Sequence, residues 1–175
     1  MGHQKHAGIL LGEDSAFQAD EAGSNPTTRS IKIMKEKFVN LYMDWARRCS
    51  ELSHARRLHV GAVIVKDDTV ISYGYNGMPA GWDNNCEDII VDGISSQLKT
   101  KPEVLHAESN AIAKLAKSSN SGLGADMFIT HSPCLDCAKL IYQSGIRRVY
   151  FGEHYRDDSG IKFLEKSGIE VKMVK

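Results

Sequence analysis

The segments HAE at residues 106–108 and PCLDC at residues 133–137 decide how this chain is interpreted. One imidazole and two thiols form a ligand set that zinc prefers, and a catalytic zinc site keeps a fourth position for water. Glu108 stands two residues after the histidine, where a carboxylate is placed to move protons rather than to bind the metal. The two segments therefore predict one catalytic zinc per chain, bound by His106, Cys134 and Cys137.

The residues around both segments predict helix starts. Pro133 suits the first turn of a helix, because it has no N–H to leave unpaired there. Cys134 and Cys137 are at positions i and i+3, so they share a helix face, and the positive end of a helix stabilises thiolates. His106 is also predicted to begin a helix. Two parallel helices with adjacent N-termini would bring the three ligands together.

These segments also have other interpretations. A C-x-x-C pair alone is typical of redox dithiols and of one half of a structural zinc site. A redox pair would leave the H-A-E segment unexplained, and the chain contains no second C-x-x-C. His106 alone would be compatible with a buried core histidine. A zinc-binding interaction module without activity would have no need of Glu108 beside the metal.

The bulk composition narrows the class of protein. The 175 residues are 42% hydrophobic and 25% charged, which is ordinary for a globular domain that buries a core. Lys and Arg number 22, as do Asp and Glu, so the chain lacks the basic excess expected of a nucleic-acid binder. No apolar run approaches the length of a membrane span, so no membrane association is expected. The four cysteines do not form a disulfide pattern, which favours a reducing cytoplasm.

The chain is predicted to form one domain, residues 30–175, after a flexible tail or expression remnant at residues 1–29. A helix is expected from residue 31, with one face formed by Ile31, Met34, Phe38, Leu41, Tyr42, Trp45 and Cys49. Residues 60–65 and 70–73 have the pattern of a hairpin, followed by a shaped loop at 74–85. Strands at 127–130, 148–151 and 171–174 should alternate with helices from 106, from 133 and at 160–166. This order predicts a mixed sheet with helices on both faces.

The neighbouring residues extend the pattern of the two segments. HAESNAI at 106–112 and SPCLDCAK at 132–139 are similar to H-A-E-x-N-A-I and S-P-C-x-x-C-A-K. VGAVIV at 60–65, GYNGMPAG at 74–81 and the segments 152–155 and 160–164 are similar to further parts of the same family. Over about residues 31–175, the chain resembles the deoxycytidylate (dCMP) deaminases of the zinc-dependent cytidine deaminase superfamily, in particular phage and bacterial members.

This resemblance implies a fold and a reaction. The fold is a three-layer α/β/α cytidine-deaminase-like arrangement with a central mixed five-stranded sheet. The reaction is hydrolytic deamination of dCMP to dUMP and ammonia, which feeds thymidylate synthesis. Zinc would make hydroxide available at neutral pH. Glu108 would carry the water proton to the ring nitrogen and then protonate the leaving amine.

The resemblance also implies substrate contacts. Asn76 should hydrogen-bond the base or the deoxyribose, although Asn-Gly is equally a strong turn signal. Tyr155 should approach the 5′-phosphate, and His59 is a further phosphate candidate, followed by Arg57 and Lys101. The expected substrate-binding residues are Asn76, Ala107, Ser132, Tyr155 and His59.

Regulation and assembly are implied by the resemblance alone. Members of the family are often hexamers that dCTP activates and dTTP inhibits. The loop 74–81 and the insertion that follows it up to residue 101 would form the effector pocket near a subunit contact, because backbone N–H groups of small residues can approach phosphates closely. The candidate residues are Gly74, Tyr75, Gly77, Gly81 and Glu87. In a monomer or dimer, the same loop would serve only as a lid over the active site.

The chain departs from some family members at one site, and two other deaminase functions are considered. Some phage members carry a second, structural zinc on cysteines before the first strand and after the G-Y-N-G loop. Here residues 53–57 read SHARR and only Cys86 lies in the second region, so a second zinc is not expected. A deaminase of free cytidine or deoxycytidine is the alternative function, although that group usually replaces the zinc histidine with cysteine. A tRNA adenosine deaminase shares H-A-E, but the zero net charge and Asn110 argue against it.

Overall fold

The computed structural model describes residues 34–174, and the fold is given for this part of the chain. Its helices are α1 (Glu36–Ser50), α2 (Ala107–Leu115), α3 (Leu135–Gln143) and α4 (Ser159–Lys166). Its strands are β1 (Gly61–Lys66), β2 (Thr69–Tyr75), β3 (Glu87–Asp92), β4 (Ser95–Thr100), β5 (Asp126–His131), β6 (Arg148–Glu153) and β7 (Glu170–Met173). The tail expected at residues 1–29 lies outside the described range. Within residues 34–174, none of the helices is long and apolar enough to cross a membrane.

Five of the strands form one mixed sheet in the order β2-β1-β5-β6-β7. β1 runs antiparallel to both β2 and β5, whereas β5, β6 and β7 run parallel to one another. α3 and α4 connect the parallel strands, because parallel neighbours need a crossover of about helix length. The predicted mixed five-stranded sheet is confirmed.

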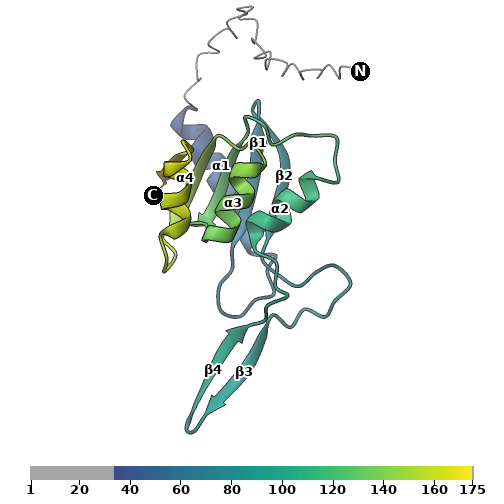
Figure 1. Ribbon diagram of the computed structural model, residues 1–175. Helices are drawn as coiled ribbons and strands as arrows, with labels where there is room; N and C mark the ends of the chain where they lie inside the picture. The colour runs from purple at the N-terminus through teal and green to yellow at the C-terminus, as the bar shows by residue number, and fades with distance from the viewer. Residues whose placement is uncertain (1–33, 175) are drawn as a thin grey trace, which may run out of the picture. The chain divides into compact units, whose positions relative to one another are not determined.

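Helices cover both faces of this sheet, as predicted (Figure 1). Successive residues of a strand point to opposite faces. Ile64 and Met127 therefore join the core beneath α2, α3 and α4, whereas Val63 and Phe128 join the core beneath α1. The result is a three-layer domain in which α2 and α3 lie in one layer.

The buried face of α1 differs from the expected one. The sequence periodicity predicts a face through Leu41 and Trp45, but these side chains are 44% and 47% exposed. The buried residues of α1 are Val39, Tyr42, Met43 and Ala46. The reason is the close approach of α1 to β1. A Cβ at Gly61 would lie 2.0 Å from the carbonyl oxygen of Ala46, so this contact requires small residues rather than the largest apolar ones.

Strands β3 and β4 form a separate two-stranded hairpin that projects away from the main sheet (Figure 1). The sequence predicts only a loop insertion here, so the hairpin is a correction. Gly93 and Ile94 connect the paired residues Asp92 and Ser95, and Gly93 adopts a φ of 60°, which favours glycine. Glycine at the first position of a two-residue loop is a hairpin signal. The uninterrupted apolar run at residues 89–91 hides the alternation by which a strand is usually recognised.

Candidate active site

The three predicted zinc ligands lie at the starts of two neighbouring helices. His106 is the N-cap of α2 and Cys134 is the N-cap of α3, both with an extended backbone, and Cys137 lies in the first turn of α3. Pro133 precedes the cap, so it is outside the first helical turn where the sequence predicts it. The caps fix the direction in which each donor points, because the chain changes there from an extended to a helical backbone.

The donor atoms are spaced for zinc. The Sγ atoms of Cys134 and Cys137 each lie 3.5 Å from Nδ1 of His106, and all three donors lie within 4.8 Å of one another. Zn–S and Zn–N bonds of about 2.3 and 2.0 Å, at tetrahedral angles, separate neighbouring S and N donors by about 3.5 Å. Within residues 34–174, this group comprises three side chains. Three protein ligands are the number that catalytic zinc sites use, so the residues present fit the metal.

The electrostatics of the cluster favour a metal-binding thiolate. Hydrogen bonds from the Cys137 thiol and from His106 lower the pKa of Cys134 to about 4. The same hydrogen bond, together with burial, raises the pKa of Cys137. The bond to Cys134 also raises the pKa of His106, against the effect of burial. One thiol of the pair is therefore ready to act as a thiolate ligand at neutral pH.

Glu108 lies in the first turn of α2 and is 4% exposed. Burial raises the pKa of its carboxyl to about 7. A carboxyl group that gains and loses a proton near neutral pH suits general acid–base catalysis. Glu108 lines the same pocket as His106 and Cys134, so this residue and two of the three metal donors line one cavity.

This cavity has a volume of about 260 Å³ and two unlike walls. The metal wall consists of His106, Glu108 and Cys134. The loop wall consists of Asn76, Glu87 and Thr100 together with four residues of the segment before β1, namely Ala55, Arg57, Leu58 and Val60. Ser132, two residues before Cys134, and Tyr155, after β6, also line the pocket. The lining residues of the cavity therefore range from Ala55 to Tyr155 in the sequence.

Four of the five expected substrate-binding residues line this pocket, namely Asn76, Ala107, Ser132 and Tyr155. Oγ of Ser132 accepts a hydrogen bond of 2.8 Å from the backbone N–H of Tyr155, which places Tyr155 at the cavity. Oδ1 of Asn76 accepts from the N–H of Val60, and its Nδ2 donates to the carbonyl of Leu58, each at 2.8 Å. Asn76 thus braces the loop wall, while its amide retains a second proton and a second lone pair.

His59 is the expected residue that the structure does not bring to the pocket. Its side chain is exposed, and its Nε2 lies 2.6 Å from the carbonyl oxygen of Ala55. Arg57, an alternative phosphate candidate, does line the pocket, and its Nη1 donates to Oγ1 of Thr100 at 2.9 Å. The other alternative, Lys101, lies 3.8 Å from the carboxylate of Asp88. Among these cations, the geometry favours Arg57.

The expected effector residues do not form one open surface. A Cβ at Gly74 would lie 2.1 Å from the carbonyl oxygen of Ala107, so Gly74 is packed beneath α2. The N–H of Gly77 donates to the carbonyl of Leu105, and the carbonyl of Gly77 accepts from the N–H of Leu105. The N–H of Gly77 is therefore already engaged in a hydrogen bond. Gly81 is exposed, with a φ of 88°.

Tyr75 and Glu87, the other two effector candidates, are also engaged elsewhere. The carbonyl of Tyr75 accepts from Asn110, and the ammonium of Lys114 lies 5.1 Å from its ring. Glu87 is 2% exposed and lines the active-site pocket. Its carboxylate accepts hydrogen bonds from the backbone N–H groups of Arg56 and Arg57, and its role in effector binding stays a prediction.

Thr100 and His131 line the pocket, but the sequence does not mark them as substrate contacts. His131 comes directly before the S-P-C segment, so its nearness to the motif is a usable signal. Thr100 reaches the pocket only because β4 pairs it with Glu87, and no spacing in the sequence predicts this pairing.

The region in which a second zinc is not expected contains an apolar cluster. Cys86 is 1% exposed and packs with Ala55, Val104 and Met78. Its thiol donates to the carbonyl of Asn84 at 3.5 Å. The absence of a second zinc stays a prediction.

Comparisons with known proteins identify the family. The model of the cytidine and deoxycytidylate deaminase zinc-binding region matches residues 34–153. Deoxycytidylate deaminase of enterobacteria phage T4 is 36% identical over 149 residues, which span 64% of this chain and 77% of the phage protein. ComE operon protein 2 of Bacillus subtilis strain 168 is 37% identical over 123 residues, 67% of this chain. The chain spans 61% of that Bacillus protein and 46% of the deoxycytidylate deaminase of Saccharomyces cerevisiae, to which it is 32% identical.

A solved structure matches the fold over most of both chains. The crystal structure of dCMP deaminase from cyanophage S-TIM5, in complex with dCMP and dUMP, superimposes with a TM-score of 0.74 at 43% identity. The match covers 81% of this chain and 99% of the cyanophage chain. It confirms the expected cytidine-deaminase-like fold. Since the family model also matches more than half of its residues, the chain belongs to the family of zinc-binding cytidine and deoxycytidylate deaminases.

Proposed function

We propose that the chain catalyses the hydrolytic deamination of dCMP to dUMP with release of ammonia. The observation that carries the proposal is one pocket that is lined both by the buried Glu108, with the zinc donors His106 and Cys134, and by the cation Arg57 and by Tyr155. The first group suits hydrolysis of an amidine, and the second suits a 5′-phosphate. Support comes from the cyanophage relative, whose structure contains dCMP and dUMP.

His106, Cys134 and Cys137 would hold the zinc, as their donor spacing allows. When bound, zinc supplies Lewis acidity that makes hydroxide available at neutral pH. Glu108 accepts the proton of the attacking water and passes it to the ring nitrogen beside the reacting carbon. It then takes the second proton from the hydroxyl on the tetrahedral carbon and gives it to the amine. The C–N bond breaks as the carbonyl forms, so that one water is consumed and one ammonia is released. Burial of Glu108 keeps this proton exchange away from bulk solvent.

The remaining lining residues would orient the nucleotide. The N–H groups in the first turn of a helix have no intrahelical partner, so the backbone at Ala107 can donate to the base. Asn76 can donate and accept toward the base or deoxyribose with its remaining amide positions. Arg57 and Tyr155 would contact the phosphate, for which a guanidinium provides paired donors.

A side-by-side assay of ammonia release from dCMP, deoxycytidine, CMP and dCTP tests the proposal. The expected result is turnover of dCMP with a kcat/KM well above that of deoxycytidine, because deoxycytidine lacks the 5′-phosphate. Preferred turnover of deoxycytidine would instead establish the free-nucleoside alternative. A zinc-loaded protein that releases no ammonia from any of the four would refute the proposed function.

We further propose assembly into a homo-oligomer, a hexamer as in many family members. Support comes from the β3–β4 hairpin, which exposes Ile89, Ile90, Val91 and Ile94. A lone two-stranded hairpin is marginally stable in water, and contiguous exposed apolar side chains are typical of protein contacts. Size-exclusion chromatography with light scattering should show a multimer that Ile89→Lys weakens and Ser96→Lys does not. A monomeric parent chain would contradict the assembly.

Regulation and location are also proposals. Activation by dCTP and inhibition by dTTP would require that the triphosphates bind different states of the assembly unequally. A titration of dCMP turnover with each triphosphate tests this, and activity that ignores both would end the proposal. A reducing cytoplasm is the proposed compartment, because Cys49, Cys86, Cys134 and Cys137 are all free thiols.

A further inference from the structure

Glu87 is a buried carboxylate for which the proposed mechanism has no use. Its side chain is 1% exposed, and it lines the active-site pocket from the loop wall. Burying a carboxylate is costly unless hydrogen bonds replace the lost water. The donors to Glu87 therefore identify what this side chain holds in place.

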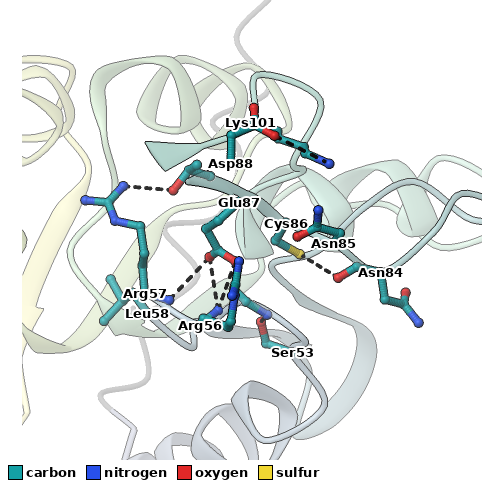
Figure 2. A network of polar contacts seen from close by, with 12 residues as sticks. Ser53, Arg56, Arg57, Leu58, Asn84, Asn85, Cys86, Glu87, Asp88 and Lys101 are labelled. Carbon is teal, nitrogen blue, oxygen red and sulfur yellow. Dashed lines mark hydrogen bonds and ion pairs between the residues drawn. The ribbon is translucent and has the colours of Figure 1, made fainter. Parts of the chain in front are cut away.

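These donors come from the segment that carries Arg57. The N–H of Arg56 lies 3.0 and 3.2 Å from the two carboxylate oxygens, and the N–H of Arg57 lies 3.3 Å from one of them. The guanidinium of Arg56 adds an ion pair at 3.7 Å. In Figure 2, the carboxylate points from β3 to the backbone at Arg56 and Arg57.

The segment depends on such side chains because it has no helix or strand of its own. Residues 51–60 lie between α1 and β1, and buried backbone groups there still need partners. Glu87 holds the segment on one side of Leu58, and Asn76 holds it at Leu58 and Val60. Arg57 is the last residue held by Glu87 and directly precedes Leu58, the first residue held by Asn76.

The base of the hairpin also fixes the side chain of Arg57. Glu87 pairs with Thr100 across β3 and β4, and Oγ1 of Thr100 accepts a hydrogen bond from Nη1 of Arg57. The N–H of Lys101 donates to the carbonyl of Cys86 at 2.9 Å, which closes the hairpin beside them. The backbone of Arg57 and its guanidinium are thus both attached to the same pair of residues.

We propose that Glu87, with Thr100, is a positioning residue that holds Arg57 at the pocket to bind the 5′-phosphate of the substrate. The inference rests on the proposed function and extends it to substrate specificity. Glu87 takes no part in the chemical step. Its effect is transmitted through Arg57, so it should appear in the KM for a phosphorylated substrate.

The test compares Glu87→Gln and Thr100→Val with Arg57→Ala, alone and combined, on dCMP and on deoxycytidine. Glu87→Gln replaces one acceptor with an amide donor that faces backbone N–H groups, and Thr100→Val removes only the acceptor for the guanidinium. Each is expected to raise the KM for dCMP about tenfold, with kcat and the kcat/KM for deoxycytidine changed less than about twofold. In the Arg57→Ala background, neither should raise the KM further.

Asp88→Asn is the matched control, because Asp88 is the next residue, is exposed, and makes only a 3.8 Å ion pair with Lys101. Its kinetics should match those of the parent chain. Thr100→Val keeps the hydrogen bonds from the backbone N–H groups of Arg56 and Arg57 to Glu87. It therefore tests the inference even if thermal melting shows that Glu87→Gln unfolds. Equal losses on both substrates, or effects that add to those of Arg57→Ala, would overturn the inference and leave dCMP deamination standing. A parent chain that does not turn over dCMP would overturn both.

Discussion

The metal wall and the loop wall of the pocket differ in how the chain builds them. The metal wall comes from two short segments, each of which ends a stretch of extended chain and begins a helix. The loop wall comes from a segment without regular structure, held by the side chains of Asn76 and Glu87 from distant parts of the sequence. Local backbone geometry therefore positions the catalytic groups, whereas long-range hydrogen bonds position the groups proposed to bind the nucleotide.

This difference predicts two classes of variant. Changes in the metal wall should act on kcat or on zinc, because the groups there take part in the chemical step. Changes in the loop wall should act on KM and on substrate preference, because they move groups that only hold the nucleotide. Four variants test this separation, in order of decreasing expected effect.

Glu108→Gln should have the largest effect. The amide cannot accept and return the proton, so kcat for dCMP should fall by about 10²–10⁴-fold. Zinc content, measured by atomic absorption, should stay equal to that of the parent chain, because Glu108 is not among the metal donors. A Gln variant with a nearly normal kcat would remove Glu108 from the proposed mechanism.

Gly160→Ala should weaken the metal wall through its support. A Cβ at Gly160 would lie 2.0 Å from the carbonyl oxygen of Pro133, directly before Cys134. The backbone at Cys134 must then shift, so zinc affinity in a competition with a chelator should fall at least about tenfold, the scale of lost support around metal ligands. Lys162→Ala, which breaks only an exposed ion pair in the same helix, is the control. Unchanged zinc affinity in Gly160→Ala would show that α4 does not hold the ligand in place.

Arg57→Ala should change substrate preference rather than chemistry. Losing a charged hydrogen-bond donor to phosphate costs about 1.5–3 kcal/mol, so the KM for dCMP should rise about tenfold to a hundredfold. The kcat/KM for deoxycytidine should change little. Tyr155→Phe should shift the same ratio by a smaller amount, and His59→Ala should leave it unchanged, because His59 lies outside the pocket lining. A larger effect from His59→Ala than from Arg57→Ala would reverse the assignment made from the structure.

Asn76→Ala should have the smallest kinetic effect and a clear effect on stability. It leaves the N–H of Val60 and the carbonyl of Leu58 without their side-chain partner. The free energy of unfolding should fall by about 1–3 kcal/mol, as urea denaturation would measure. If Asn76 also contacts the base or deoxyribose, dCMP and deoxycytidine should lose activity equally. Asn76→Asp, which keeps the acceptor for Val60, should retain part of the stability.

The sequence predicts the layers of the fold better than their packing. The apolar run at residues 60–65 is predicted as a strand, and the structure places β1 at Gly61–Lys66, with cores on both faces of the sheet. The face of α1 was harder to predict, because the close contact at Gly61 selects Ala46 over the larger Trp45. The β3–β4 hairpin was missed because its strands pair only with each other and lack an alternating pattern.

By itself, the sequence determined the metal wall. Spacings of two and three residues place His106, Glu108, Cys134 and Cys137 at the starts of two helices. Helix geometry then fixes the direction in which each side chain points. The tertiary structure alone decided the loop wall. Glu87 and Thr100 meet Arg57 across separations of 30 and 43 residues, which no local rule encodes. Such contacts depend on where the whole fold places each segment. For that reason the sequence ranks His59 above Arg57 as a phosphate contact, whereas Arg57 is the one that lines the pocket.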